Sequence, residues 1–125
     1  ATGGMDTDEQ EDGGTHWGRA GVTGPVEPTR AELDARRDPV LVEFGSASCG
    51  HCRAAQPLIA AALAGHPGVS HIKVEDGPGR PLGRSFRVKL WPTLVFMAGG
   101  VEVARLVRPQ DGTAIDEALA RLGAA

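Results

Sequence analysis

The chain has 125 residues, with 13 basic and 16 acidic side chains and a formal net charge of -3. A chain of this size buries one core, so we expect one compact domain. Its arginines are scattered rather than gathered into a basic stripe with aromatic residues, which argues against a nucleic-acid partner. Because no apolar run approaches the ~20 residues of a membrane-spanning helix, we predict no membrane partner.

The first 24 residues are polar and rich in glycine, with five acidic side chains between Asp6 and Asp12. Such a segment lacks the apolar residues that offset the entropy cost of ordering. We therefore predict a flexible acidic tail over 1–24, with an acidic docking arm as the alternative, and a folded domain over 25–125. Residues 1–4 are interpreted as a remnant added ahead of an initiator at Met5. A protein that starts there without a targeting segment is expected in the cytoplasm.

The predicted elements alternate between helices and strands. Thr29 and Glu32 have the spacing of a capping box, which predicts a short helix that ends at Arg37. The elements expected after it are a strand over 40–44, a helix from 49 to 64, a strand over 70–75, a helix over 82–88, a hairpin of strands over 93–97 and 101–107, and a final helix capped by Asp111 or Thr113. This order predicts an α/β fold with a mixed sheet and helices on both faces.

The only two cysteines stand in the motif Cys49-Gly50-His51-Cys52, at the start of the second predicted helix. Structural disulfides are uncommon in a reducing cytoplasm, so we interpret the pair as a reversible redox couple. Unpaired N–H groups and the helix dipole favour a thiolate at a helix start, which predicts Cys49 as the nucleophile. Cys52, one turn further in, is then the resolving thiol. As an imidazolium, His51 would stabilise the thiolate and make the disulfide a stronger oxidant.

Two other uses of such a motif are metal binding and haem attachment. Zinc needs about four ligands, and the chain has no second cysteine pair, although His16, His66 and His71 could contribute in a dimer. Covalent haem attachment needs a histidine directly after the second cysteine, where Arg53 stands. We therefore predict no metal and no cofactor.

Four features of the chain, taken together, resemble the thioredoxin family over roughly 26–122. They are the strand Val40-Leu41-Val42-Glu43-Phe44, the Cys-Gly-His-Cys motif as in protein disulfide isomerases, Pro57 eight residues after Cys49, and Trp91-Pro92-Thr93 before the hairpin. The resemblance implies a thioredoxin fold in which Pro92 follows a cis peptide bond and lies against the cysteine pair. It also implies that Trp91, Pro92 and Thr93 bind an extended segment of a client protein through its backbone. Gly50 and Pro57 are expected in structural roles, Pro57 as a kink in the helix.

Glu43 is a carboxylate within an otherwise apolar strand. Burying it in its charged form costs several kcal/mol, which favours uptake of a proton. The family places a buried acid six residues before the first cysteine, so the resemblance implies that Glu43 accepts the proton of Cys52. It also implies that Lys73, on the next strand, is the lysine partner of this acid. The alternatives are a carboxylate in water at a strand edge and an ordinary surface lysine.

The chain departs from the family pattern around the motif. Ser48 and Gly45 stand where the family usually has aromatic residues, and Arg108 stands where a glycine helps to shape the substrate groove. We expect Trp91 either to contact substrate or to pack in the core. Arg108 is expected either to favour the Cys49 thiolate and narrow the groove, or to remain solvated.

Together these features predict a monomeric thiol–disulfide oxidoreductase that acts on disulfide-containing client proteins. In the cytoplasm it would be a net reductant with isomerase capacity from His51, recycled by a thiol reductase. The alternative is a chaperone or adaptor of the same fold. Such a protein would hold partners around Trp91, Pro92 and Arg108 without redox turnover.

Overall fold

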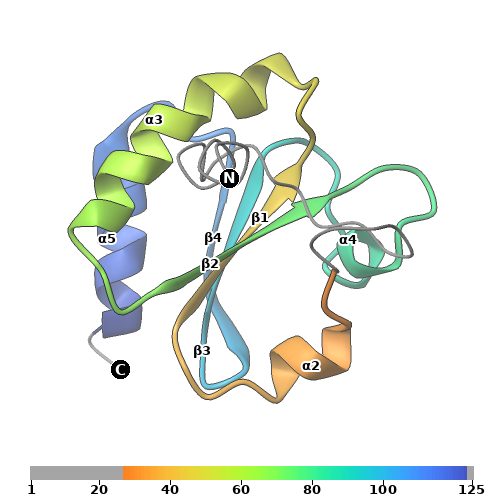
Figure 1. Ribbon diagram of the computed structural model, residues 1–125, viewed down its shortest axis with the longest axis horizontal. Helices are drawn as coiled ribbons and strands as arrows, with labels where there is room; N and C mark the ends of the chain where they lie inside the picture. Colours follow the sequence, from red (N-terminus) through yellow and green to blue (C-terminus); the bar gives the residue numbers. More distant parts are fainter. Residues whose placement is uncertain (1–26, 124–125) are drawn as a thin grey trace, which may run out of the picture.

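The computed structural model describes residues 27–123, and the elements follow the predicted order (Figure 1). The predicted acidic tail over 1–24 lies outside the described residues. The helices are α2 (Arg30–Asp34), α3 (Gly50–Ala64), α4 (Pro81–Ser85) and α5 (Gly112–Gly123), and the strands are β1 (Val40–Gly45), β2 (Ser70–Glu75), β3 (Thr93–Ala98) and β4 (Val101–Val107).

Two short helices end earlier than predicted. The capping box of Thr29 and Glu32 is present, but α2 ends at Asp34 rather than Arg37. Beyond it, the guanidinium of Arg36 donates two hydrogen bonds to the carboxylate of Asp38. Helix α4 ends at Ser85 because Arg87, with a φ of 58°, has left the helical region.

The four strands form one mixed sheet in the order β2-β1-β3-β4. The central strand β1 pairs parallel to β2 and antiparallel to β3, and β4 lies antiparallel to β3. Every residue of β1 is buried, as its nearly continuous apolar sequence predicts for a strand covered on both faces. The hairpin between β3 and β4 turns at Gly99 and Gly100, whose positive φ angles favour glycine.

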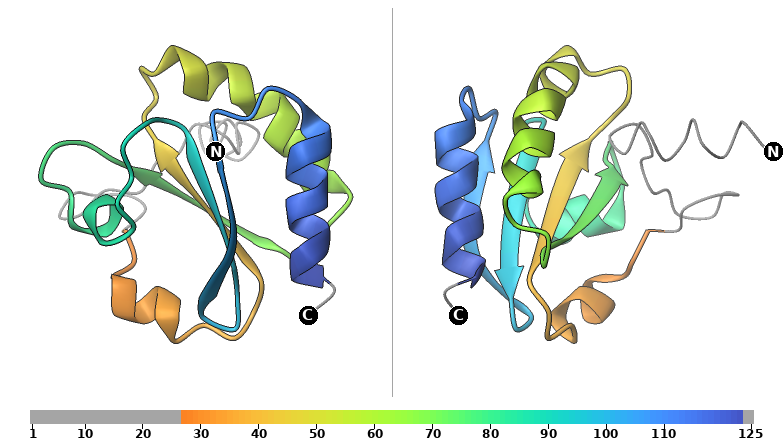
Figure 2. Two further views of the ribbon diagram at one scale, coloured as in Figure 1. Left: turned by 180° about the vertical axis from the view of Figure 1, so that it is seen from behind. Right: turned by 60° about the vertical axis from the view of Figure 1, so that its left-hand side comes forward.

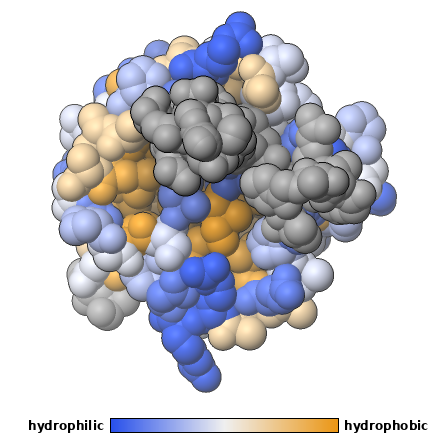
Figure 3. All heavy atoms as spheres, in the orientation of Figure 1, coloured by the Kyte–Doolittle hydropathy of each residue, from blue (hydrophilic) through white to orange (hydrophobic). Residues whose placement is uncertain are grey.

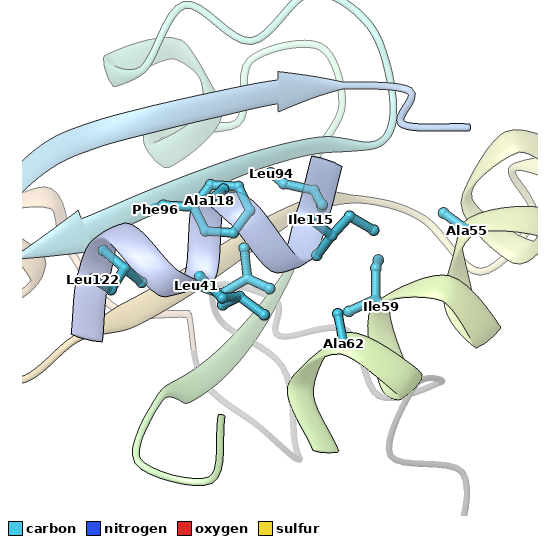
Figure 4. Packing of buried hydrophobic residues seen from close by; sticks show 10 residues of the cluster. Leu41, Ala55, Ile59, Ala62, Leu94, Phe96, Ile115, Ala118 and Leu122 are labelled. Carbon is cyan, nitrogen blue, oxygen red and sulfur yellow. The ribbon is translucent and has the colours of Figure 1, made fainter. Parts of the chain in front are cut away.

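Helices cover both faces of the sheet, which confirms the predicted layering (Figure 2). On one face, Leu41, Leu94 and Phe96 of the sheet pack against apolar side chains of α3 and α5, including Ile59 and Ile115 (Figure 4). On the other face, a second cluster joins the sheet to α2 and α4. Apolar side chains also gather on the molecular surface over α3 and α5 (Figure 3).

Helix α3 places the motif at the end of β1. It begins at Gly50, and Cys49 is its N-cap. The Sγ atom of Cys49 takes the place of the usual capping oxygen and accepts a hydrogen bond from the backbone N–H of Cys52 over 3.2 Å. Pro57 lies inside the helix, as predicted.

Candidate active site

The two cysteines lie at the same end of α3 in different environments. Both are free thiols, and Cys49 is partly exposed, whereas Cys52 is only 1% exposed. Burial, together with a hydrogen bond to Cys49, raises the pKa of the Cys52 thiol from 9.0 to about 12. An accessible sulfur at a helix N-terminus therefore has a buried, protonated sulfur next to it.

The two residues between the cysteines are exposed. A Cβ at Gly50 would have only a guanidinium nitrogen of Arg53 within 4 Å, at 3.9 Å, so the available space does not require glycine there. His51 lines a surface cavity of about 420 Å³. The cavity is lined by α3 and by the loop after β4, through His51, Ala54, Ala55, Leu58, Arg108, Pro109 and Gln110.

Glu43 is completely buried, so the alternative of a carboxylate in water at a strand edge is wrong. One oxygen, Oε2, accepts a hydrogen bond of 2.7 Å from the Nε2 amide of Gln56. The other, Oε1, lies 2.8 Å from Nε2 of His71. Gln56 Nε2 also donates to the carbonyl oxygen of Cys52 over 2.8 Å, and this amide therefore connects the buried acid to the cysteine helix.

Lys73 is 6% exposed, which excludes the alternative of an ordinary surface lysine. It lies directly opposite Glu43 in the parallel pairing of β1 and β2. Its Nζ atom donates to Oε1 of Gln56 over 2.8 Å. Since Gln56 in turn donates to Glu43, the lysine is linked to the acid through this amide.

Gln56 and His71 were not predicted as site residues, although the sequence carries a signal for both. Gln56 follows Cys52 by four residues, which places both side chains on one face of a helix. His71 precedes Lys73 by two residues in a strand, so both side chains point to the same face of the sheet. The sequence interpretation considered His71 only as a zinc ligand.

The peptide bond between Trp91 and Pro92 is cis. The indole Nε1 of Trp91 donates to Oδ2 of Asp76 over 2.9 Å, so this half-buried ring is held in one orientation. Thr93 is only 1% exposed, and its Oγ1 donates to the carbonyl oxygen of Leu90. This side chain therefore points into the protein, and the binding of a client backbone by the segment around Pro92 stays a prediction.

Arg108 is half-buried and hydrogen-bonded to the segment around the cis bond. Its backbone N–H donates to the carbonyl oxygen of Pro92 over 2.9 Å. Its Nε atom donates to the carbonyl oxygen of Trp91 over 2.8 Å. With a φ of 51°, Arg108 adopts a conformation that glycine reaches at lower cost.

Within residues 27–123, no group of three or more His, Cys, Asp or Glu side chains is arranged to hold a metal ion. In the same part of the chain, no helix has the length and apolar character needed to cross a bilayer.

A family model and a solved structure that match this chain both belong to thioredoxins. The thioredoxin family model matches residues 27–121. The structure of thioredoxin 2 from Pseudomonas aeruginosa PAO1 in its reduced form is 57% identical, with a TM-score of 0.71, and the match covers 79% of this chain and 93% of that one.

Two curated relatives are similar over part of their length. Human protein disulfide-isomerase A2 is 38% identical over 96 residues, which cover 71% of this chain and 18% of that protein. Thioredoxin H2-1 from Oryza sativa subsp. japonica is 31% identical over 68 residues, which cover 54% of this chain and 49% of the rice protein. The chain thus spans about half or less of the length of these relatives. The fold, the cysteine motif and the family match together show that this chain belongs to the thioredoxin family.

Proposed function

We propose that the chain is a thiol–disulfide oxidoreductase of protein substrates, with Cys49 and Cys52 as its redox couple. The observation that carries this proposal is the pairing of a partly exposed Cys49 at a helix N-terminus with a buried Cys52 thiol beside it. The N-terminal end of a helix favours a sulfur anion, and Cys49 is the sulfur that solvent and a client can reach.

The reaction would proceed in two exchanges. The Cys49 thiolate attacks one sulfur of a client disulfide, the client's S–S bond breaks, and the other client sulfur leaves as a thiolate. Cys52 then loses its proton and attacks Cys49, which forms the Cys49–Cys52 disulfide and releases the second client sulfur. The client gains two electrons and the cysteine pair loses two.

The second exchange needs a base, because a thiol with a pKa of about 12 is protonated at neutral pH. Glu43 is our candidate base for Cys52. It lies near enough for its charge to contribute to the raised pKa of this thiol. Lys73 and Gln56 hold the acid in place through their hydrogen bonds.

The cavity beside the motif is our candidate client-binding site. His51 and Arg108 give it a polar and cationic rim, and Ala54, Ala55 and Leu58 give it an apolar wall. The Arg108 guanidinium donates a hydrogen bond to the Trp91 carbonyl oxygen. A client whose backbone N–H pairs with this oxygen would therefore compete with the guanidinium. This contact favours a narrow range of clients.

We further propose that the protein works as a monomer and as a net reductant in the cytoplasm, recycled by a thiol reductase. The direction of exchange depends on the potential of the couple relative to its partner. His51 would supply isomerase capacity by stabilising the reduced form. The Cys-Gly-His-Cys motif and the similarity to human protein disulfide-isomerase A2 support the proposed isomerase capacity.

The test is the reduction of insulin by dithiothreitol, followed by turbidity, with the wild type and with Cys49→Ser. Ser48→Ala, at an exposed neighbouring position, is the matched control. We expect the wild type and the control to accelerate precipitation and Cys49→Ser to have no effect. Equal rates for the wild type and Cys49→Ser would instead favour a chaperone or adaptor that binds partners without redox turnover.

A further inference from the structure

His71 connects the buried acid to the surface of the protein. Glu43 and His71 share a contact of 2.8 Å between Oε1 and Nε2, yet the Glu43 side chain is 0% exposed and the His71 side chain 20% exposed. Strand β2, which carries His71, is one of the two edge strands of the sheet in the described part of the chain. The imidazole therefore contacts a carboxylate that water does not reach while being itself in contact with water.

Other polar groups face Glu43 from the helix and the neighbouring strand. Cys52 and Gln56 face it from α3, and Lys73 lies opposite it on β2. The Gln56 amide donates to Glu43 and Cys52 and accepts from Lys73, so its orientation is fixed. An amide does not titrate, and an ammonium group has donors but no acceptor. Of the described residues bonded to Glu43, His71 is the one whose side chain can both accept a proton and reach water.

The proposed reaction requires such a group. Each time Cys52 resolves a mixed disulfide, its proton passes to Glu43. Before Glu43 can accept another proton, it has to return to the carboxylate form, although it has no direct contact with solvent. Until the proton moves on to water it can also return to Cys52 before that sulfur attacks, so a buried acid without a route to water slows the resolving step.

We propose that His71 acts through Glu43: it carries the proton between this carboxylate and solvent while Cys52 resolves the mixed disulfide. The inference rests on the proposed function. The Sγ–H bond of Cys52 breaks and its proton goes to Glu43. The new S–S bond to Cys49 forms, and the bond between Cys49 and the client sulfur breaks with the electron pair leaving on that sulfur. Before this attack the proton passes on from Oε1 of Glu43 to Nε2 of a neutral His71, and Nδ1 releases a proton to water, so that the proton does not return to Cys52.

Stopped-flow mixing of the reduced protein with 5,5′-dithiobis(2-nitrobenzoate) separates the two exchanges. One coloured thionitrobenzoate anion is released when Cys49 attacks the reagent, and a second when Cys52 displaces the group bound to Cys49. The variant is His71→Gln, since a glutamine can keep a hydrogen bond to Glu43 but cannot carry a proton. The matched control is His66→Gln, because the His66 side chain is 21% exposed and lies 2.9 Å from the Asp116 carboxylate, away from the cysteines.

We expect His71→Gln to slow the second phase about tenfold or more and to remove one ionisation from its pH–rate profile. Its first phase and both phases of His66→Gln should match the wild type. Added imidazole should accelerate the second phase of His71→Ala, in which the truncated side chain leaves space next to Glu43.

Three results would overturn the inference: a second phase of His71→Gln with wild-type rate and pH profile, equal slowing of both phases, or no effect of imidazole on His71→Ala. A wild type that released no second thionitrobenzoate would instead contradict the proposed function of the cysteine pair. The failure of one proposal is thus distinguishable from the failure of the other.

Discussion

Alkaline pH is expected to destabilise the reduced protein through Cys52. In the folded state, burial and the neighbouring Cys49 raise the pKa of this thiol from 9.0 to about 12. In the unfolded chain, the thiol loses its proton near its ordinary value. The stability that Cys52 contributes is therefore fully present below pH 9 and is lost as the pH rises towards 12. The slope approaches about 1.4 kcal/mol per pH unit above pH 9, so the free energy of unfolding should fall by about 3 kcal/mol between pH 8 and pH 11.

The measurement compares the wild type with Cys52→Ala by urea unfolding between pH 8 and pH 11, under a reductant and followed by tryptophan fluorescence. All other titrating groups are common to both proteins, and the chain contains no tyrosine that would ionise in this range. From pH 8 to pH 11, we expect the free energy of unfolding of the wild type to fall by about 3 kcal/mol more than that of Cys52→Ala. A difference that stays constant from pH 8 to pH 11 would refute the argument that the buried thiol keeps its proton.

Two further predictions concern backbone positions with positive φ. Gly100→Ala should lower the free energy of unfolding by more than about 2 kcal/mol in urea titrations, because Gly100 has a φ of 82° and a Cβ there would overlap the carbonyl oxygen of Asp34. Gly99→Ala, with a φ of 60° and open space, should cost only about 1 kcal/mol, and equal losses would contradict this reasoning. Arg108→Gly should relieve the strained φ and free the Trp91 carbonyl oxygen, which lowers the KM for insulin, whereas an unchanged or higher KM would argue against Arg108 restricting client access.

The sequence predicted the order of the elements because local chemistry determines them. A capping box, a buried apolar strand and paired glycines at a hairpin each act over a few residues. The ends of α2 and α4 were predicted less well: α2 ends at Asp34 and α4 at Ser85, two residues before the positive φ of Arg87. Neither end follows from apolar periodicity.

The hydrogen-bond partners of the site residues were harder to predict than the identity of those residues. The spacing of Cys49 and Cys52 at a helix start was enough to propose the pair, and Glu43 was proposed from an acid in an apolar strand together with the family resemblance. The contact between His71 and Glu43 depends on the register of β2 against β1, which pairs Glu43 with Lys73.

The central claim is that Cys49 attacks the client and Cys52 resolves the product, and a covalent trap tests it most directly. Cys52→Ser would be mixed with a disulfide-containing client, and the complex would be digested and mapped by mass spectrometry. We predict a complex joined through Cys49, released by dithiothreitol and absent from Cys49→Ser. A complex that forms instead through Cys52 in the Cys49→Ser protein, with none in Cys52→Ser, would contradict the assignment of both cysteines.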